Sequence, residues 1–526
     1  MPGLQKPSIR LAKQNASLLF LITHLLHFLR TMESLSDTLW DVVISGTGLQ
    51  QSLLALALSR SEKNVLHVDP NEYYGGSEAA LSLEDADEWA EKYGGSDANA
   101  PFAGAEVTKE SEGLAASRTY SLPLAPQLIH ARSELVNQLV SSKAFRQIEF
   151  LAVGSFYIYQ AAAEDSSPVL SRIPSTREDV FANKAIPARA KRLLMKFLKF
   201  VLDYNSEPHT DLWKTKESQR LVEFLETEFK LDQDLQSYVV TLTLSTDGKI
   251  SVRDGLAAIH RHLTSMGVFG SGFAAVYPKW GGLSEVAQVG CRAGAVGGAV
   301  YMLGTGISGV QHVQSDGETQ VEVSLTNGVT VKSKTLVQST DKISGDGTRV
   351  TRLIAVIDSH IPDMFQPVVE GAPTPCTAIV AFPTGSVESD GGDVSGFPIY
   401  ALVHSSDSGE CPAGQCTVIL STVSSTNSKK LLSHALSLFL AAISTPEPVK
   451  CLWRMHYEQT VGSGSFIVEN NIGVFDRITP DLAFNDSILD PVKRAWQMVI
   501  GEANEDEYMQ FDDREGVNDD DDQFNS

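Results

Sequence analysis

Residues 40–76 read WDVVISGTGLQQSLLALALSRSEKNVLHVDPNEYYGG. The run DVVI predicts a strand, the apolar residues after the glycine turn predict a buried helix, and the run NVLHV predicts a second strand. The second strand ends at Asp69, 23 residues after Gly46. A dinucleotide-binding fold places the acid that binds a ribose hydroxyl at this spacing. The sequence therefore predicts a βαβ unit of the Rossmann type.

One position departs from the dinucleotide-binding pattern Gly-x-Gly-x-x-Gly. The third glycine lets the helix and the strand pack closely beside the pyrophosphate, and this chain carries Gln51 there. Two interpretations remain open: a working nucleotide-binding domain, or a scaffold of the same type that no longer binds a dinucleotide. In the second case Gly46, Gly48 and Asp69 are a vestigial nucleotide motif, and we expect no cofactor.

The block DPNEYYGG at 69–76 follows the second strand. Together with the GTGL turn it resembles the superfamily of Rab GDP-dissociation inhibitors and Rab escort proteins, and in particular escort proteins of the fungal type. This pairing is more specific than the glycines alone, because a generic flavoprotein has no reason to carry two adjacent tyrosines there. The resemblance implies an α/β fold: a Rossmann-type, FAD-binding-like large domain with an antiparallel sheet, and an inserted, mainly α-helical domain.

Composition and charge limit the class of protein and partner. The chain has 526 residues, which exceeds the usual size of one domain, and 42% of them are hydrophobic, as in ordinary globular proteins. The net charge of −23 argues against nucleic acid as a partner, because phosphate binding needs clustered lysine and arginine. Five scattered cysteines without a CxxC pair predict neither a disulfide framework nor a zinc site, and they fit a reducing, cytoplasmic location.

No catalytic pattern occurs in the sequence. The twelve histidines include no HExxH pair, and there is no GxSxG elbow or P-loop. An oxidase of this fold needs a second flavin contact near its C-terminus, and Gly501-Glu502 is a poor candidate because it runs directly into an acidic tail. We therefore expect no catalytic residue and no metal site, and a binding protein rather than an enzyme.

The resemblance and the composition divide the chain into five parts. They are a non-native or disordered leader at 1–31, the first part of the FAD-like domain at 32–125 with an insertion loop at 77–116, a helical domain at 126–266, the second part of the FAD-like domain at 267–500, and a disordered acidic tail at 501–526. The insertion is acidic and glycine-rich, which is typical of a surface loop. An insertion of this length is typical of escort proteins in the resembling superfamily.

Both ends of the chain have unusual compositions. The leader has the pattern of a signal or transit peptide, although the resemblance favours Met32 as the true start. Its apolar run is too short to span a bilayer. The tail has eleven acidic residues against Arg514 between 502 and 522. Such a run is either a solubility tail or a segment that attracts a basic partner.

The helical domain has two interpretations. Its apolar residues recur at helical spacing, and the helix expected at 189–202 carries a basic face opposite an apolar one. The apolar residues could simply fill a core of their own. The resemblance implies instead that two helices part to accept a geranylgeranyl lipid, and the candidates for its contacts are Met195, Phe197, Leu198 and Val201.

The resemblance also implies that the helical domain docks onto the α/β heterodimer of Rab geranylgeranyl transferase. The segment LQSYV at 235–239 matches the family's contact in order and character. Leu235 and Tyr238 are the candidates, with the tyrosine as the aromatic anchor of a small interface. The alternative interpretation is that Tyr238 is a core residue.

The segment YPKWGGLSEVAQVGCR at 277–292 resembles the family's YP-x-x-G-x-G-E-x-x-Q block, with one additional residue near the glycines. In the family this block and the YYGG block form a platform for the switch regions of a GDP-bound Rab GTPase. Carried over by position, the platform residues are Tyr73, Tyr74, Trp280, Glu285 and Arg292. Aromatic residues and arginine are the expected anchors of a protein interface.

The resemblance implies a Rab escort protein as the function. Such a protein binds newly made GDP-bound Rab GTPases, presents them to the transferase for C-terminal prenylation and delivers them to membranes, so it is cytoplasmic with transient membrane association. It is a non-catalytic accessory subunit. The first alternative is a Rab GDP-dissociation inhibitor that recycles prenylated Rabs. The second is an FAD-dependent, amine-oxidase-like oxidoreductase.

Overall fold

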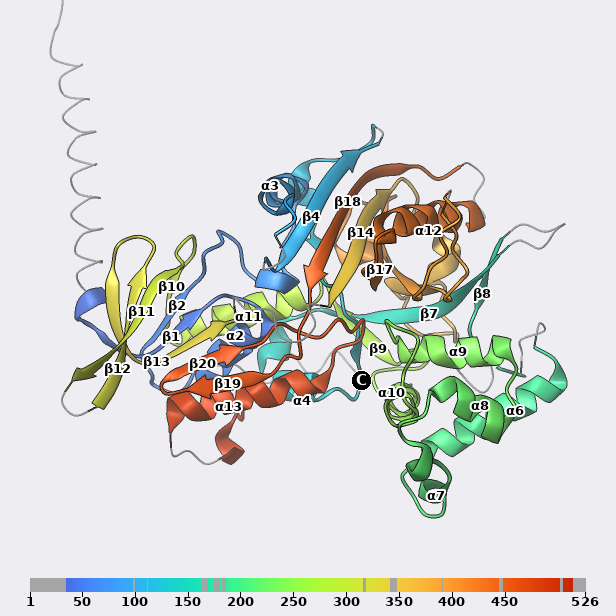
Figure 1. The fold of residues 1–526 in the computed structure, drawn as a ribbon, viewed down its shortest axis with the longest axis horizontal. Helices are drawn as coiled ribbons and strands as arrows, with labels where there is room; N and C mark the ends of the chain where they lie inside the picture. The colour runs from blue at the N-terminus through green and yellow to red at the C-terminus, as the bar shows by residue number, and fades with distance from the viewer. Residues whose placement is uncertain are drawn as a thin grey trace, which may run out of the picture.

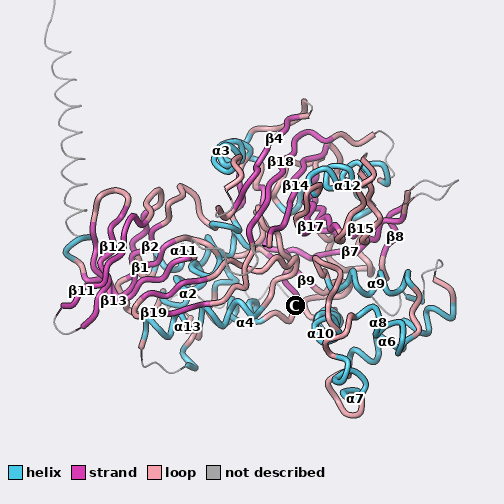
Figure 2. The backbone as a smooth tube through the Cα atoms, in the orientation of Figure 1, coloured by secondary structure: helices cyan, strands magenta, loops and turns pink. Residues whose placement is uncertain are grey.

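The computed structural model describes residues 35–97, 100–110, 112–161, 168–174, 180–181, 186–315, 318–340, 348–389, 391–443, 448–501 and 505–513. The leader expected at 1–31 and the end of the acidic tail from 514 on lie outside the described residues. The described chain forms two large β-sheets and a group of helices beside the second sheet (Figure 1, Figure 2).

The first sheet has eight strands and is built on the expected βαβ unit. It has the order β10-β2-β1-β13-β12-β11, and the β19–β20 hairpin joins it at β13. β1, β2 and β10 run parallel, so their carboxyl ends meet at one edge, directly before the GTGL turn and the YYGG block. The bounds are β1 (Leu39–Ser45), β2 (Val65–Val68), β10 (Val300–Met302), β11 (Ile307–Ser315), β12 (Glu318–Leu325), β13 (Thr330–Ser339), β19 (Phe466–Glu469) and β20 (Ile472–Phe475).

The helix of the βαβ unit is buried along its whole length. α2 (Leu49–Leu58) packs against α11 (Leu283–Val296) and α13 (Leu489–Ile500). A Cβ atom at Gly290 of α11 would lie 2.5 Å from the carbonyl oxygen of Ser52, so only glycine allows this approach of α11 to α2. The close packing fixes α11 beside the glycine turn.

The second sheet has ten strands in the order β4-β18-β14-β17-β16-β15-β7-β9-β6, with β8 paired to β7. α12 (Ser428–Ala442) packs on β14 and β17 through an apolar cluster. The bounds are β4 (Phe102–Lys109), β6 (Ile129–His130), β7 (Phe150–Gln160), β8 (Val169–Arg172), β9 (Ala275–Pro278), β14 (Arg349–Ile357), β15 (Thr377–Phe382), β16 (Ile399–Ser405), β17 (Cys416–Val423) and β18 (Cys451–Thr460).

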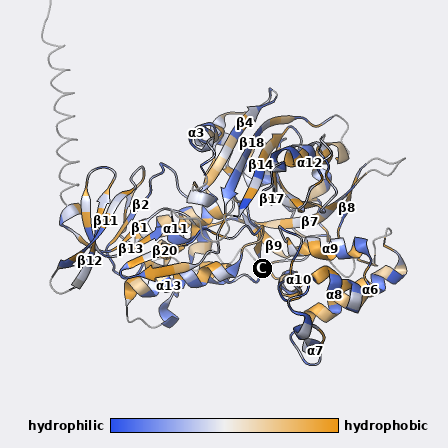
Figure 3. Cartoon of the chain, viewed as in Figure 1, coloured by the Kyte–Doolittle hydropathy of each residue, from blue (hydrophilic) through white to orange (hydrophobic). Residues whose placement is uncertain are grey.

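Among the described residues of this region, five helices form a lobe beside the second sheet (Figure 1). They carry hydrophobic and hydrophilic residues in alternation along their length (Figure 3), and their apolar faces share one core with residues of β7, β15 and β16. The lobe is therefore packed on the sheet. The bounds are α6 (Ala188–Leu202), α7 (His209–Trp213), α8 (Leu221–Phe229), α9 (Gln233–Thr243) and α10 (Val252–Ser265).

The helical domain expected at 126–266 differs from the structure at its beginning. α4 (Glu134–Ser141) buries Leu135 and Leu139 in the apolar cluster of α2 and α13, and β7 belongs to the second sheet. The expected helical spacing is confirmed at α4, but Ile129–His130 form strand β6. Periodicity also does not indicate which core a helix packs on.

The insertion loop expected at 77–116 is wrong at residues 83–93 and 102–109, which form α3 (Leu83–Tyr93) and β4. Ser82 and Asp85 form a capping box at the start of α3. The acidic residues that suggested a loop lie on the solvent side of this helix, while Leu83, Ala86 and Trp89 are buried. β4 then pairs with β18 at the edge of the second sheet.

The disordered tail expected from 501 is wrong for residues 505–513. The Tyr508 ring lies 5.3 Å from the Trp496 ring, and Met509 is 1% exposed in the cluster of the βαβ unit. The Phe511 backbone N–H donates to the Ser141 carbonyl oxygen over 3.1 Å. The three apolar side chains dock this segment although acidic residues surround them in sequence.

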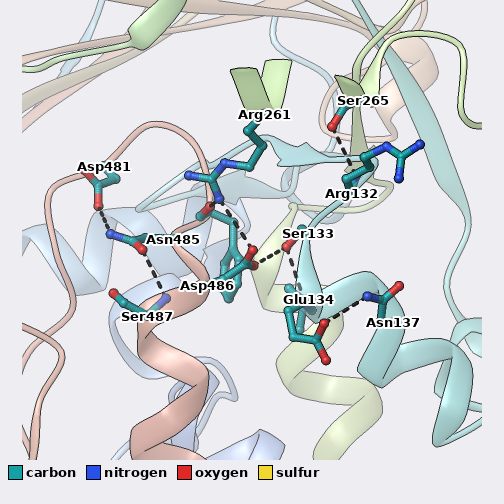
Figure 4. A network of polar contacts seen from close by, with 12 residues as sticks. Arg132, Ser133, Glu134, Asn137, Arg261, Ser265, Asp481, Asn485, Asp486 and Ser487 are labelled. Atoms are coloured by element: carbon teal, nitrogen blue, oxygen red, sulfur yellow. Dashed lines mark hydrogen bonds and ion pairs between the residues drawn. The ribbon is translucent and has the colours of Figure 1, made fainter. Parts of the chain in front are cut away.

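A polar network joins the lobe to the chain before α13 (Figure 4). Arg261 of α10 donates to the Phe484 carbonyl oxygen over 3.3 Å, and its guanidinium lies 3.6 Å from the Asp486 carboxylate. Ser133, at the start of α4, donates to the same carboxylate over 2.5 Å. The contacts connect α10, α4 and the C-terminal chain at one point. Within the described residues, no helix has the length and apolar character needed to cross a membrane.

Candidate partner-binding site

The side chain of Gln51 lies over the glycine turn. A Cβ atom at Gly48 would lie 3.1 Å from Gln51 Oε1, and one at Gly46 would lie 3.4 Å from Gln51 Nε2. The amide donates to the hydroxyl of Ser339 on β13. The residue that replaces the third glycine therefore fills space directly above the other two.

Both carboxylate oxygens of Asp69 are used within the protein. Oδ2 accepts from the backbone N–H of Thr47 over 2.6 Å and from its hydroxyl over 2.7 Å. Oδ1 accepts from the backbone N–H of Asn71 over 2.7 Å and from its side-chain amide over 3.0 Å. Burial raises the pKa of Asp69 and these donors lower it. The carboxylate that would bind a ribose hydroxyl in a dinucleotide-binding fold therefore accepts hydrogen bonds from Thr47 and Asn71 instead.

Glu78 occupies the amino end of α2. Its Oε2 accepts from the Leu49 backbone N–H over 2.9 Å, and the residue is only 3% exposed. Burial raises the pKa of Glu78 to about 7, against the lowering effect of the backbone donors. In a dinucleotide-binding fold the pyrophosphate lies at this helix end.

A cleft of about 420 Å³ remains beside these residues, and its lining includes Gly46, Gln51, Asp69, Tyr73 and Glu78. A dinucleotide would meet the Gln51 amide over the glycines and a carboxylate at the helix end. The residues of this cleft do not fit a dinucleotide cofactor, so the second interpretation of the glycine motif is the one that the geometry supports.

The YYGG loop lies directly on the glycine turn. The Gly75 backbone N–H donates to the carbonyl and hydroxyl oxygens of Thr47 over 3.2 and 3.1 Å. Gly75 and Gly76 have φ values of +100° and +51°, and a Cβ atom at Gly76 would lie 3.2 Å from the Gly48 Cα atom. Glycine is therefore required at Gly75 and Gly76 of this loop.

The two tyrosines of the loop have different surroundings. Tyr73 packs on the apolar cluster that contains Trp89 of α3, and it lines the cleft. The half-buried Tyr74 has its ring centroid 6.3 Å from that of Tyr301 on β10. The structure therefore does not bring Tyr73 to the same surface as Tyr74.

α11 carries Glu285 and Arg292, and its first turn contacts the chain that follows this loop. The Ser284 hydroxyl at its first turn accepts from the Ala80 backbone N–H over 3.2 Å, just after the YYGG block. Glu285 is half-buried and Arg292 is exposed. Burial raises the pKa of Glu285, and the positive charge of Arg292 lowers it. The two residues share one face of the helix with the exposed Gln288.

We call the combined surface of Tyr74, Glu285, Gln288, Arg292 and Tyr301 the α11 surface. Gln288 and Tyr301 were not predicted from the sequence as members of this surface. Gln288 is the last residue of the matched YP-x-x-G-x-G-E-x-x-Q block, so the motif contained the signal. Placing Tyr301 at this surface depends on the pairing of β10 with β2, which sequence alone does not reveal.

Trp280 is held in an exposed position on the turn before α11. It is 52% exposed and has a φ of +72°. Its backbone N–H donates to the Ser408 carbonyl oxygen over 2.9 Å, and a Cβ atom at Gly409 would lie 2.3 Å from the indole. The Lys279 ammonium lies 5.1 Å from the ring centroid.

A buried polar group lies below this turn. The Tyr277 hydroxyl donates to Glu410 Oε1 over 2.7 Å, and Glu410 Oε2 lies 2.6 Å from His404 Nδ1. Glu410 and His404 are fully buried. This group fixes the loop between β16 and β17, on which the Trp280 ring rests.

Two of the four candidate lipid contacts are core residues. Phe197 and Val201 of α6 are fully buried in the core of the lobe, while Met195 and Leu198 are partly buried against it. None of the four lines the cleft of about 550 Å³ between α8, α9 and the ends of β15 and β16. Phe197 and Val201 are packed in the core and are not accessible to a lipid in this structure.

The candidate transferase contacts are also buried. Leu235 is 2% exposed and Tyr238 is 8% exposed, and both belong to the core of the lobe. The core interpretation of Tyr238 agrees with this burial, and an exposed aromatic anchor does not. The LQSYV pattern alone could not separate the two interpretations, because an amphipathic helix and an interface anchor use the same residue types.

Comparisons with known proteins agree with this geometry. A sequence profile of the GDP dissociation inhibitor family matches residues 36–444. The chain is 29% identical over 430 residues to the Rab proteins geranylgeranyltransferase component A of Saccharomyces cerevisiae, covering 80% of this chain and 67% of the yeast protein. It is 30% identical over 405 residues to the protein of the same name from Candida albicans, covering 73% of this chain and 59% of that protein.

The fold is also shared with a solved structure. A Rab GDI from Plasmodium falciparum superposes with a TM-score of 0.62 at 18% identity, covering 88% of this chain and 99% of the other. The family profile spans the glycine turn, the YYGG loop, the lobe and α11. The chain therefore belongs to the GDP dissociation inhibitor family.

Proposed function

We propose that this chain acts as a Rab escort protein. It binds newly made GDP-bound Rab GTPases, presents them to the Rab geranylgeranyl transferase heterodimer and delivers the prenylated Rabs to membranes. The observation that carries the proposal is the likeness to two fungal proteins named component A of a Rab geranylgeranyltransferase, over 80% and 73% of this chain. The chain is then a non-catalytic, cytoplasmic accessory subunit with transient membrane association.

The Rab-binding platform is the α11 surface. Tyr74 and Arg292 are the residue types that anchor protein interfaces, and Glu285 gives the surface a second charge. Trp280 extends the platform along the turn before α11, because its exposed ring is held from below by Gly409. A rigid surface of this kind loses little conformational entropy on binding.

Tethering explains how a non-catalytic protein promotes prenylation. When the platform holds the folded part of a Rab, the flexible cysteine-bearing Rab tail stays free. If the transferase binds the same escort protein, the tail reaches an effective concentration in the millimolar range, as is usual for short flexible linkers. The escort protein thus raises the rate of transfer without touching the reacting atoms.

The lobe is the proposed acceptor of the geranylgeranyl lipid. Met195 and Leu198 remain candidates because they are only partly buried. Phe197 and Val201 could contact lipid only if the helices separate. Burial of the lipid stabilises the complex by roughly 0.8 kcal/mol per methylene group, which could offset such a rearrangement.

A reconstituted reaction tests the proposal. Unprenylated GDP-loaded Rab, the transferase heterodimer and the lipid donor are mixed with and without this protein, and lipid transfer to the Rab is measured. We expect transfer only when the protein is present. Equal transfer in its absence would contradict the escort function.

The same purified components separate the two alternatives. A GDP-dissociation inhibitor would extract prenylated Rab from vesicles and leave the transfer reaction unchanged. An FAD-dependent oxidoreductase would carry flavin and show its yellow colour and visible absorbance. Gln51 and Glu78 disfavour this second alternative because they occupy the space that a dinucleotide needs.

A further inference from the structure

A carboxylate of the chain itself binds at the glycine turn. The amino end of α2 would leave the Leu49 N–H without a partner, and in dinucleotide-binding folds a phosphate satisfies such donors. Here the carboxylate of Glu78 accepts from Leu49 over 2.9 Å. Its Oε2 atom also lies close to Gly48, where a Cβ atom would be only 3.4 Å away.

This carboxylate belongs to the segment that follows Tyr74. The Glu78 backbone N–H donates to the Gly75 carbonyl oxygen over 2.9 Å, which closes the turn after the YYGG block. Gly75 in turn donates to Thr47. The YYGG loop is therefore held at two points, through its backbone at Gly75 and through the Glu78 side chain at α2.

From these contacts we infer that Glu78 is a positioning residue for the partner-binding surface: it takes the place of a nucleotide phosphate at α2 and thereby fixes the loop that presents Tyr74. The inference rests on the proposed function for the role of Tyr74. Glu78 is 3% exposed, so it acts through the loop and not by touching a partner.

Hydrogen exchange tests the structural part without a Rab. In Glu78→Ala, the amides in residues 47–52 and 69–79 should exchange about tenfold faster or more, because the buried hydrogen bond between the Glu78 side chain and the Leu49 N–H is lost. Glu78→Gln keeps an acceptor oxygen and should exchange like the wild type at pH 5, where the wild-type side chain is also uncharged. Ser77→Ala, at the neighbouring half-buried position, is the matched control. Unchanged exchange in Glu78→Ala at these residues would overturn the inference.

Rab affinity tests the functional part. Glu78→Ala should bind GDP-loaded Rab about tenfold or more weakly, and Glu78→Gln should bind like the wild type. Faster exchange with unchanged Rab affinity would overturn the positioning role. If the wild type binds no Rab, the proposed function fails, while the exchange experiment still decides whether Glu78 holds the loop. An equal loss in the glutamine and alanine variants would overturn the role of the acceptor oxygen.

Discussion

At the scale of single residues, three side chains close the nucleotide site. Gln51 covers the glycines, Asp69 is hydrogen-bonded to the glycine turn, and Glu78 accepts a hydrogen bond at the amino end of α2. The departure at Gln51 could be predicted because the glycine pattern is defined in sequence. The role of Glu78 could not, because it depends on the YYGG loop folding back onto the turn.

The pKa of Glu78 gives a pH prediction. Burial raises the pKa of the Glu78 carboxyl group from 4.5 to about 7, so this group binds its proton more tightly in the folded protein than in the unfolded chain. Stability contributed by this group is therefore present at low pH and falls as pH rises from 4.5 through 7. Glu78→Gln should not show this loss. The free energy of unfolding of the variant minus that of the wild type should therefore be larger at pH 8 than at pH 5, by on the order of 1–3 kcal/mol.

Urea unfolding of both proteins at the two pH values measures this difference. Other titrating groups are common to the wild type and the variant, so their effects cancel in the comparison. The same pH dependence in both proteins would show that Glu78 does not titrate in this range.

The position of Trp280 can be tested through two glycines of one loop. Gly409 and Gly414 have similar φ values of +78° and +88°, but only at Gly409 would a Cβ atom meet the indole, at 2.3 Å. Alanine at either position has a similar backbone cost. Gly409→Ala should displace the ring and weaken Rab binding by about 1 kcal/mol, while Gly414→Ala should not. Titration calorimetry measures both, and equal affinities would remove Trp280 from the platform.

Burial could not be predicted for several site residues. Tyr73 and Tyr74 are adjacent and chemically identical, yet one packs toward α3 and the other toward β10. Phe197 and Tyr238 lie on amphipathic helices, where a core residue and a ligand contact have the same spacing. Tertiary packing decides between these cases, and the sequence pattern contains no information about it.

At the scale of elements, regular periodicity was informative and composition was misleading. The βαβ unit follows from its apolar pattern. α3 was missed because its acidic residues dominate the composition, although Leu83, Ala86 and Trp89 have the spacing of a buried helix face. The segment 505–513 was missed for the same reason.

The docked C-terminal segment gives a stability prediction. Met509 is 1% exposed in the cluster that contains Trp496 and the residues of α2. Met509→Ala should lower the free energy of unfolding by about 2–5 kcal/mol, as is usual for a buried methionine. The adjacent Gln510 is exposed, so Gln510→Ala should change it by about 0.5 kcal/mol or less. Urea unfolding measures both, and a neutral Met509→Ala would contradict the docking.

At the scale of the whole molecule, two sheets and a lobe share packed boundaries. The lobe core includes side chains of the second sheet, and Arg261 and Asp486 connect α10 to the chain before α13. These contacts hold the lobe against both the second sheet and the chain that leads into α13. The family resemblance predicted this architecture from two short motifs, whereas the boundaries depended on packing.

The proposal that the α11 surface binds GDP-loaded Rab is tested most directly by the affinity of this protein for Rab in its two nucleotide states. Titration calorimetry compares GDP-loaded and GTP-loaded Rab on the wild type and on Tyr74→Ala. We expect the wild type to prefer GDP-loaded Rab and Tyr74→Ala to lose about 1–3 kcal/mol of that binding free energy, as an interface anchor does. Binding that ignores the nucleotide and is unchanged by Tyr74→Ala would contradict the account.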